Sequence, residues 1–343
     1  MSTGVPSRPA LAGAGLAGNL HRLSPGRYAP PKVIHRFQAL LFVHPALFYA
    51  DREEYLAGTV PFIQAGLDAD EPVMVAVPGD NLDHIRTALG IDADRIQLHD
   101  MSVTGRNPGR IIPGVLLAFA AAHLGKRVRI IGEPIWAGRT ATEYPACAQH
   151  EALINAAFAG RRATILCPYD TSRLDRSWLD DAYRTHPILQ TGSAVWESPH
   201  YADPVVVAAG FNLPLEDPPA QATTITIDLH ALPAIRRVVT AEAIAAGLPP
   251  DRVSDLTLAV NELAANTVKH TAAGGTLALW TDRTRLICQL TDTGHITNPL
   301  AGRIPVPPQQ PGSRGLVLVN QLCDLVRVHT RPGATTIRLH MHR

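Results

Sequence analysis

The sequence has no excess of charge of either sign. Its 31 Lys and Arg residues nearly balance 30 Asp and Glu residues, which leaves a formal net charge of +1. Proteins that hold the phosphates of nucleic acids normally carry a basic excess, so we expect no direct contact with nucleic acid. With 46% hydrophobic and 18% charged residues, the composition is typical of a folded protein.

Long apolar runs and paired cysteines are missing too. The longest apolar candidate, residues 115–124, is interrupted by His123 and falls short of the roughly 20 residues that span a bilayer. The four cysteines lie far apart without a CxxC pair, which indicates reduced thiols. No apolar stretch behind Arg8 could form a signal peptide. We therefore expect a cytoplasmic protein that does not enter a membrane.

The first half of the chain predicts an arm and an α/β domain. Residues 1–36 are rich in Gly, Pro, Ala and Arg without a period, which predicts a flexible arm. Residues 37–190 alternate short apolar runs with helix-length segments, the pattern of a doubly wound α/β domain with a parallel sheet. The predicted strands are residues 39–43, 73–77, 96–99, 128–132 and 163–167, and the predicted helices are residues 53–67, 81–89, 110–124 and 142–159.

The second half predicts a linker and an α+β domain. Residues 191–222 contain five prolines, which predicts a Pro-rich linker with one strand-like patch at residues 205–208. Residues 223–343 predict helices on one face of a largely antiparallel sheet. The predicted strands are residues 224–229, 276–281, 286–291, 325–329 and 335–339, and the predicted helices are residues 233–246, 251–271 and 316–323.

Three segments of the second domain hold residues suited to a nucleotide. In ELAANTVKH, residues 262–270, Glu262 and Asn266 project from nearly the same side of a helix and suit a general base and a Mg²⁺ ligand. In DTG, residues 292–294, Asp292 can accept the amine of adenine. GSRG, residues 312–315, opens a helix whose free N–H groups suit phosphates. Taken alone, each segment is more often an ordinary helix face, turn or helix start.

Together, the order and spacing of these segments resemble the N, G1 and G2 boxes of the GHKL ATPase superfamily, the Bergerat fold. The stretch GSRGLVLVNQLCDLVRV, residues 312–328, is similar to the anti-sigma-factor serine kinases of the actinobacterial type. The resemblance covers about residues 225–343 and implies ATP and Mg²⁺ as cofactors. It implies Glu262 as the general base and Asn266 as the Mg²⁺ ligand. The other residues expected to bind the nucleotide are His270, Asp292, Gly294, Gly312, Ser313, Arg314 and Gly315.

The same resemblance implies a serine/threonine protein kinase that phosphorylates an antagonist (anti-anti-sigma) protein and binds a sigma factor. A homodimer is a further expectation. Ile296 stands where a second loop glycine is expected, so a module that binds ATP and partners without turnover is the alternative. A P-loop ATPase is excluded, because no G-x-x-x-x-G-K-[ST] motif occurs.

A sensor histidine kinase is a further alternative. HEALIN, residues 150–155, superficially resembles the box that carries a phosphoaccepting histidine, here His150. Such a box needs a second long amphipathic helix after it. A short β-rich run at residues 163–167 and an expected turn at residues 167–170 stand there instead, which makes this alternative weaker.

The first domain resembles the MEDS sensory domain across residues 39–190. The blocks that carry this resemblance are HPALFYADREEYL (44–56), GRNPGRIIPG (105–114), IGEPIWAGR (131–139), QHEALINAAF (149–158), CPYD (167–170) and THP (185–187). It implies an unknown small organic ligand. Ligands of doubly wound sheets bind beyond the carboxyl ends of the strands, and the candidates there are His44, Glu133, Trp136, His150, Tyr169 and Asp170. Four of them could hold a metal (His44, Glu133, His150 and Asp170), although a hydrogen-bonded histidine network is the interpretation that we favour.

Overall fold

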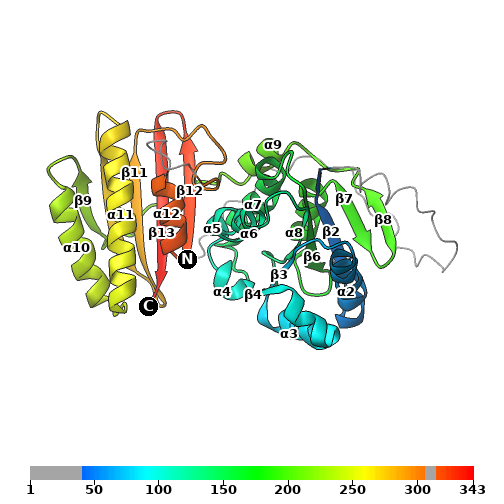
Figure 1. The fold of residues 1–343 in the computed structure, drawn as a ribbon. Coiled ribbons are helices and arrows are strands. Elements are labelled where there is room, and N and C mark those ends of the chain that lie inside the picture. Colours follow the sequence, from blue (N-terminus) through cyan, green and yellow to red (C-terminus); the bar gives the residue numbers. More distant parts are fainter. Residues whose placement is uncertain (1–40, 306–313) are drawn as a thin grey trace, which may run out of the picture.

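The computed structural model describes residues 41–305 and 314–343. The expected N-terminal arm, and Gly312 and Ser313 of the expected phosphate loop, lie outside the described residues. Two α/β units follow one another along the chain, and each has a sheet of its own (Figure 1).

The first domain is built on an eight-stranded sheet with the order β4-β3-β5-β6-β2-β7-β8, to which β1 adds through β6. All pairings are parallel except β7 with β8. The strands are β1 Phe42–Val43, β2 Pro45–Tyr49, β3 Val73–Val77, β4 Gln97–Asp100, β5 Val128–Gly132, β6 Ala163–Asp170, β7 Ile188–Thr191 and β8 Ala194–Glu197.

Helices cover both faces of this sheet, as the alternating pattern predicted. Side chains from α2 and α3 bury one face with Val75 and Ile131, and side chains from α5 to α9 bury the other with Ile130 and Ile165. The helices are α2 Arg52–Asp68, α3 Gly79–Leu89, η1 Gly90–Arg95, α4 Met101–Thr104, α5 Pro108–Ile111, the π-helical turn η2 Ile112–Leu116, α6 Leu117–Ala122, α7 Tyr144–Ala157, α8 Arg176–Thr185 and α9 Pro204–Ala209.

Two strand boundaries of the first domain were predicted wrongly. The first predicted strand ends at residue 43, but β2 begins at Pro45 and runs to Tyr49. The expected turn at residues 167–170 is strand, because β6 continues and pairs with β2 as far as Asp170. A proline is tolerated at the first residue of a strand, where no ladder donor is lost. His44 therefore lies between two strands, inside the sheet.

Residues 191–222 are more ordered than a linker. β8 adds an antiparallel strand to β7, and the strand-like patch at residues 205–208 is helix α9. Asp203 caps that helix by accepting from the backbone N–H groups of Val205 and Val206, and Pro204 takes the first helical position, where its missing N–H costs nothing. Within this segment, residues 192–193, 198–203 and 210–222 lack helix and strand.

The second domain has the predicted α+β architecture. Its antiparallel sheet has the order β12-β13-β11-β10-β9, and apolar side chains from α10, α11 and α12 pack together on it. The elements are β9 Thr223–Ile227, α10 Leu232–Ala245, α11 Pro250–His270, β10 Gly275–Thr281, β11 Arg285–Asp292, α12 Arg314–Leu322, β12 Leu325–Arg331 and β13 Ala334–His342. No helix among the described residues is long and apolar enough to cross a membrane.

Candidate functional site

The start of α12 lies directly against the polar side of α11. Leu256, Val260 and Leu263 lie on the opposite side of α11, where they are buried against the sheet. A Cβ placed on Gly315 would lie 2.9 Å from Asn266 Nδ2 and 3.1 Å from Glu262 Oε2. Only a glycine lets the backbone come this close without displacing those side chains. The structure thus brings the ELAANTVKH segment and the end of the GSRG segment to one place.

Asp292 is held at the end of β11. Its Oδ1 accepts from the backbone N–H of Gly294 at 2.8 Å, and its Oδ2 accepts from the Thr267 hydroxyl at 2.6 Å. The Thr335 hydroxyl donates to the carbonyl of Gly294 at 3.0 Å. An ionised carboxylate has about four acceptor positions, so Asp292 keeps capacity for another donor while its orientation is fixed.

A cavity of about 380 Å³ lies beside these residues. Asn266, His270, Asp292 and Gly294 of the predicted set line it. Its apolar walls are formed by Leu263, Leu290, Ile296, Leu316 and Ile337. A cavity with apolar walls and a carboxylate suits a purine ring that donates an amine. The residues present therefore fit adenine in the cavity and phosphates toward Gly315.

Ile296 stands at the position where a second loop glycine was expected, and the structure shows what its side chain and backbone contact. Its side chain lines the cavity, and its backbone N–H donates to the Thr330 hydroxyl at 2.9 Å. The position is therefore used for an apolar wall contact and an anchor to β12. Arg314 begins α12.

The six candidates in the first domain divide into separate groups. Glu133 is 2% exposed and lies beyond β5, where it accepts from Tyr49 Oη at 3.1 Å and Asn81 Nδ2 at 2.8 Å. Burial raises the pKa of Glu133 to about 8, and Asp170 adds to this rise. Glu133 and Asp170 therefore form a group at the carboxyl ends of the strands, with Tyr49 and Asn81 as members that the sequence did not single out.

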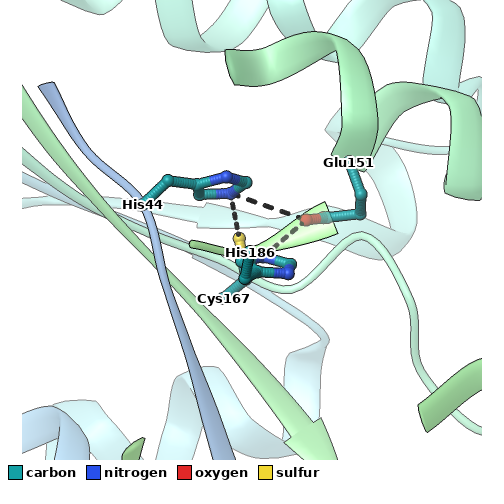
Figure 2. A group of neighbouring side chains, drawn as sticks. All are labelled: His44, Glu151, Cys167 and His186. Carbon is teal, nitrogen blue, oxygen red and sulfur yellow. Dashed lines mark hydrogen bonds and ion pairs between the residues drawn. The ribbon is translucent and has the colours of Figure 1, made fainter. Parts of the chain in front are cut away.

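His44 belongs to a different group, with Glu151, Cys167 and His186 (Figure 2). Their nitrogen, oxygen and sulfur atoms all lie within 4.8 Å of one another, and all four residues are buried. Tyr169 flanks this cluster, with its ring centroid 5.5 Å from that of His186. The metal set considered from the sequence, His44 with Glu133, His150 and Asp170, is therefore not the group that the fold assembles.

Comparison with known proteins identifies both units. Residues 43–187 match the MEDS family, the methanogen/methylotroph, DcmR sensory domain, and residues 225–341 match the histidine kinase-like ATPase domain. The chain joins a MEDS sensory domain to a histidine kinase-like ATPase domain. The second assignment implies that this domain binds ATP. No curated protein matches the chain significantly.

A solved structure also matches part of the chain. It contains the RsbU and RsbW domains of a protein from Mycobacterium tuberculosis, with 20% sequence identity and a TM-score of 0.28. The match covers 36% of this chain and 34% of that one, so this chain spans about a third of that protein's length. A TM-score of this size carries no argument about function.

The MEDS domain contacts the ATPase domain directly at α12. Asn107, fully buried at the start of α5, donates from Nδ2 to the carbonyl of Asn320 at 2.8 Å. Arg106 forms an ion pair of 3.0 Å with Asp324. A Cβ on Gly109 would lie 2.1 Å from Asn320 Oδ1, so the backbone of α5 touches α12 without room for a methyl group.

The segment between β11 and α12 is also docked on the MEDS domain. Leu300 and Ile304 pack against the MEDS core, and Asn320 Nδ2 donates to the carbonyl of Gly302 at 3.1 Å. Gly302 lines the ATPase cavity. One buried asparagine thus contacts both the MEDS domain and the wall of the cavity.

Trp136 and His150 lie toward this interface. The Arg139 guanidinium covers the Trp136 ring at 3.8 Å and donates to the carbonyls of Gly105 and Arg106. His150 is buried on α7, and its pKa is lowered by burial and by Arg303 of the ATPase domain. Arg139 also donates to the carbonyl of Pro134. The loop that follows Glu133 therefore supports the turn that contacts α12.

Proposed function

We propose that the chain is a sensory regulator in which the MEDS domain controls an ATP- and Mg²⁺-dependent serine/threonine protein kinase. Its partners in this proposal are an antagonist protein, which it phosphorylates, and a sigma factor, which it binds, in the cytoplasm. The approach of Gly315 to both Glu262 and Asn266, beside a cavity with Asp292 in its wall, is the observation that carries the proposal.

In this proposal each site residue of the ATPase domain has a separate role. Asp292 accepts the adenine amine, and the walls of the cavity exclude water from the ring. The backbone at Gly315, at the start of α12, presents N–H groups to phosphate. Asn266 ligates Mg²⁺ through its amide oxygen, and ATP supplies the phosphoryl group. Glu262 accepts the proton of the attacking serine hydroxyl, since its carboxylate lies within reach of the same backbone.

The direct contact at α12 supports the proposed control by the MEDS domain. Glu133 and Arg139 lie on one loop, and Arg139 holds the turn at Arg106. Arg106 in turn pairs with Asp324, which lies between α12 and β12. A ligand that displaces Tyr49 or Asn81 from Glu133 would disturb this loop. The contact supports coupling between the two sites, for which about 1–3 kcal/mol is the usual scale. The Pro-rich segment before residue 223 is not needed for it.

A second candidate is an ATP-binding partner switch without turnover. It is favoured by the segment between β11 and α12, which is anchored at Ile296 and docked through Leu300 and Ile304. Anchored in this way, residues 296–304 would have little freedom to close over a bound nucleotide. The sensor histidine kinase has no such support, because His150 is 1% exposed and a phosphoaccepting histidine must reach the nucleotide.

The test uses the full chain with γ-labelled ATP, Mg²⁺ and protein extract from the native cell. Label transferred to serine or threonine of a small protein, and lost with Glu262→Ala, is the expected result. ATP binding with no transfer to any protein would favour the second candidate. Label on a histidine of the chain itself would contradict both.

A further inference from the structure

Four side chains in the interior of the MEDS domain converge on one point (Figure 2). Nε2 of His44 lies 3.3 Å from Sγ of Cys167 and 3.6 Å from Oε2 of Glu151. Nε2 of His186 lies 3.0 Å from the same Oε2. Ligand atoms at the corners of a tetrahedron around Zn²⁺ lie roughly 3.3–3.8 Å apart, given bonds of about 2.0–2.3 Å. These three distances lie within a few tenths of an ångström of that spacing, and all four ligand atoms lie within 4.8 Å of one another.

Both imidazoles are oriented as metal-binding histidines are. Nδ1 of His44 lies 3.1 Å from Asn155 Oδ1, and Nδ1 of His186 lies 3.0 Å from the carbonyl of Ala182. An oxygen acceptor next to Nδ1 places the ring proton there and leaves the lone pair on Nε2. In each ring that free Nε2 faces Glu151 and the centre of the cluster.

A hydrogen-bond network accounts for this geometry only in part. The Cys167 thiol and the Tyr169 hydroxyl lie close enough to interact with Glu151, yet within the described part of the chain neither carboxylate oxygen of Glu151 nor Nε2 of His186 forms a hydrogen bond of good geometry. Buried polar atoms without partners cost about 1–3 kcal/mol each. A nucleophilic cysteine is not a better explanation, because Cys167 is fully buried and burial raises the pKa of its thiol.

We propose that His44, Glu151, Cys167 and His186 bind a divalent transition metal, with zinc as the best fit. Two neutral imidazoles, a thiolate and a carboxylate carry two negative charges, which a divalent cation balances in the interior. Nitrogen and sulfur ligands exclude Mg²⁺ and Ca²⁺. The ligands come from the β1–β2 junction, α7, β6 and the end of α8, so the ion ties four separate segments of the MEDS fold together.

The experiment measures metal in the full chain, purified without a histidine tag. Elemental analysis should find about one zinc per chain. After exchange into Co²⁺, a thiolate-to-cobalt charge-transfer band should appear in the absorption spectrum. Cys167→Ala and His186→Ala should lower the affinity for zinc at least about tenfold. Cys147→Ala and Cys288→Ala are matched controls, because both are buried free thiols outside the cluster, and they should keep the metal and the band.

Two outcomes would overturn the proposal. The first is wild-type protein that contains no transition metal and takes up neither Zn²⁺ nor Co²⁺ from a buffered solution. The second is metal retained in full by Cys167→Ala. If a variant fails to fold, the cobalt–thiolate band of the wild-type protein still decides, since its absence excludes Cys167 as a ligand. None of these readouts depends on ATP, so the proposed kinase can fail while the metal site stands.

Discussion

Gly109→Ala tests whether the contact between α5 and α12 controls the ATP site. Alanine favours a helix over glycine by about 0.5–1 kcal/mol, so the change should not weaken the MEDS domain by itself. The added methyl would, however, lie 2.1 Å from Asn320 Oδ1. Either the two domains separate slightly or the Asn320 side chain moves.

The expected effect of Gly109→Ala on ATP affinity is derived from the contacts of Asn320. Moving its side chain breaks the bond from Asn107 Nδ2 to its Oδ1, at 3.3 Å, and the bond from its Nδ2 to Gly302 at the cavity wall. Overpacking of this kind costs about 1–3 kcal/mol. We expect this strain to destabilise the conformation that binds ATP. The affinity for ATP should then weaken by about 5- to 150-fold.

Titration calorimetry of Mg²⁺–ATP into the full chain measures this effect. Gly132→Ala is the matched control, because a Cβ there meets no atom within 4 Å, and its ATP affinity should equal that of the wild type. Thermal unfolding of both variants checks that the domains still fold. Equal ATP affinity for Gly109→Ala and wild type would refute the coupling through α12.

Three further changes test the proposed residue roles. Glu262→Ala should keep ATP binding but lower phosphotransfer by about 10²–10⁴, because the general base is lost; a normal transfer rate in the labelled-ATP assay would exclude that role. Asn266→Ala should remove the dependence of ATP affinity on Mg²⁺, measured by titration with and without the ion, whereas a normal Mg²⁺ response would count against the metal role. Glu133 has its pKa raised from 4.5 to about 8 by burial, so the folded state holds a proton that the unfolded state releases between these values. Stability should therefore fall as the pH rises through this window, and Glu133→Gln should flatten that fall in urea unfolding at about pH 5 and about pH 8; an unchanged slope would contradict the shift.

The fold of both domains could be predicted because their patterns are local. Alternating apolar runs and helices predict a doubly wound sheet without any knowledge of distant contacts. The segments around Glu262, Asp292 and Gly315 each carry a recognisable order of residues. The fold confirms that these three segments meet.

The interior of the MEDS domain could not be predicted in this way. Pro45 looked like the end of a strand, so His44 was placed at a strand end, whereas β2 begins there. Glu151 is adjacent to His150, and both are buried on α7, so helical spacing alone did not say which one faces the cluster. Cys167 and His186 stand in the blocks CPYD and THP, and only the sheet register brings them together.

The interface between the domains was equally hidden. The sequence predicted residues 191–222 as a Pro-rich linker, and this was the only connection between the domains that it indicated. The structure instead shows Asn107 against Asn320, which are separated by 213 positions. The glycines at 109 and 114 in the block GRNPGRIIPG both lie against α12. They could have indicated a close helix contact, but a glycine alone does not reveal which segment it contacts.

Binding of Mg²⁺–ATP to the full chain, compared between wild type and Asp292→Asn, tests the central claim most directly. Asparagine offers one acceptor oxygen where aspartate offers two, and both aspartate oxygens are already engaged by Thr267 and Gly294. We predict that the wild type binds and that Asp292→Asn binds about 5- to 150-fold more weakly, the loss of a buried bond to a charged group worth about 1–3 kcal/mol. Asp251→Asn, at the exposed start of α11, should bind as the wild type does. A wild type that binds no ATP, or equal affinity in all three proteins, would contradict the account.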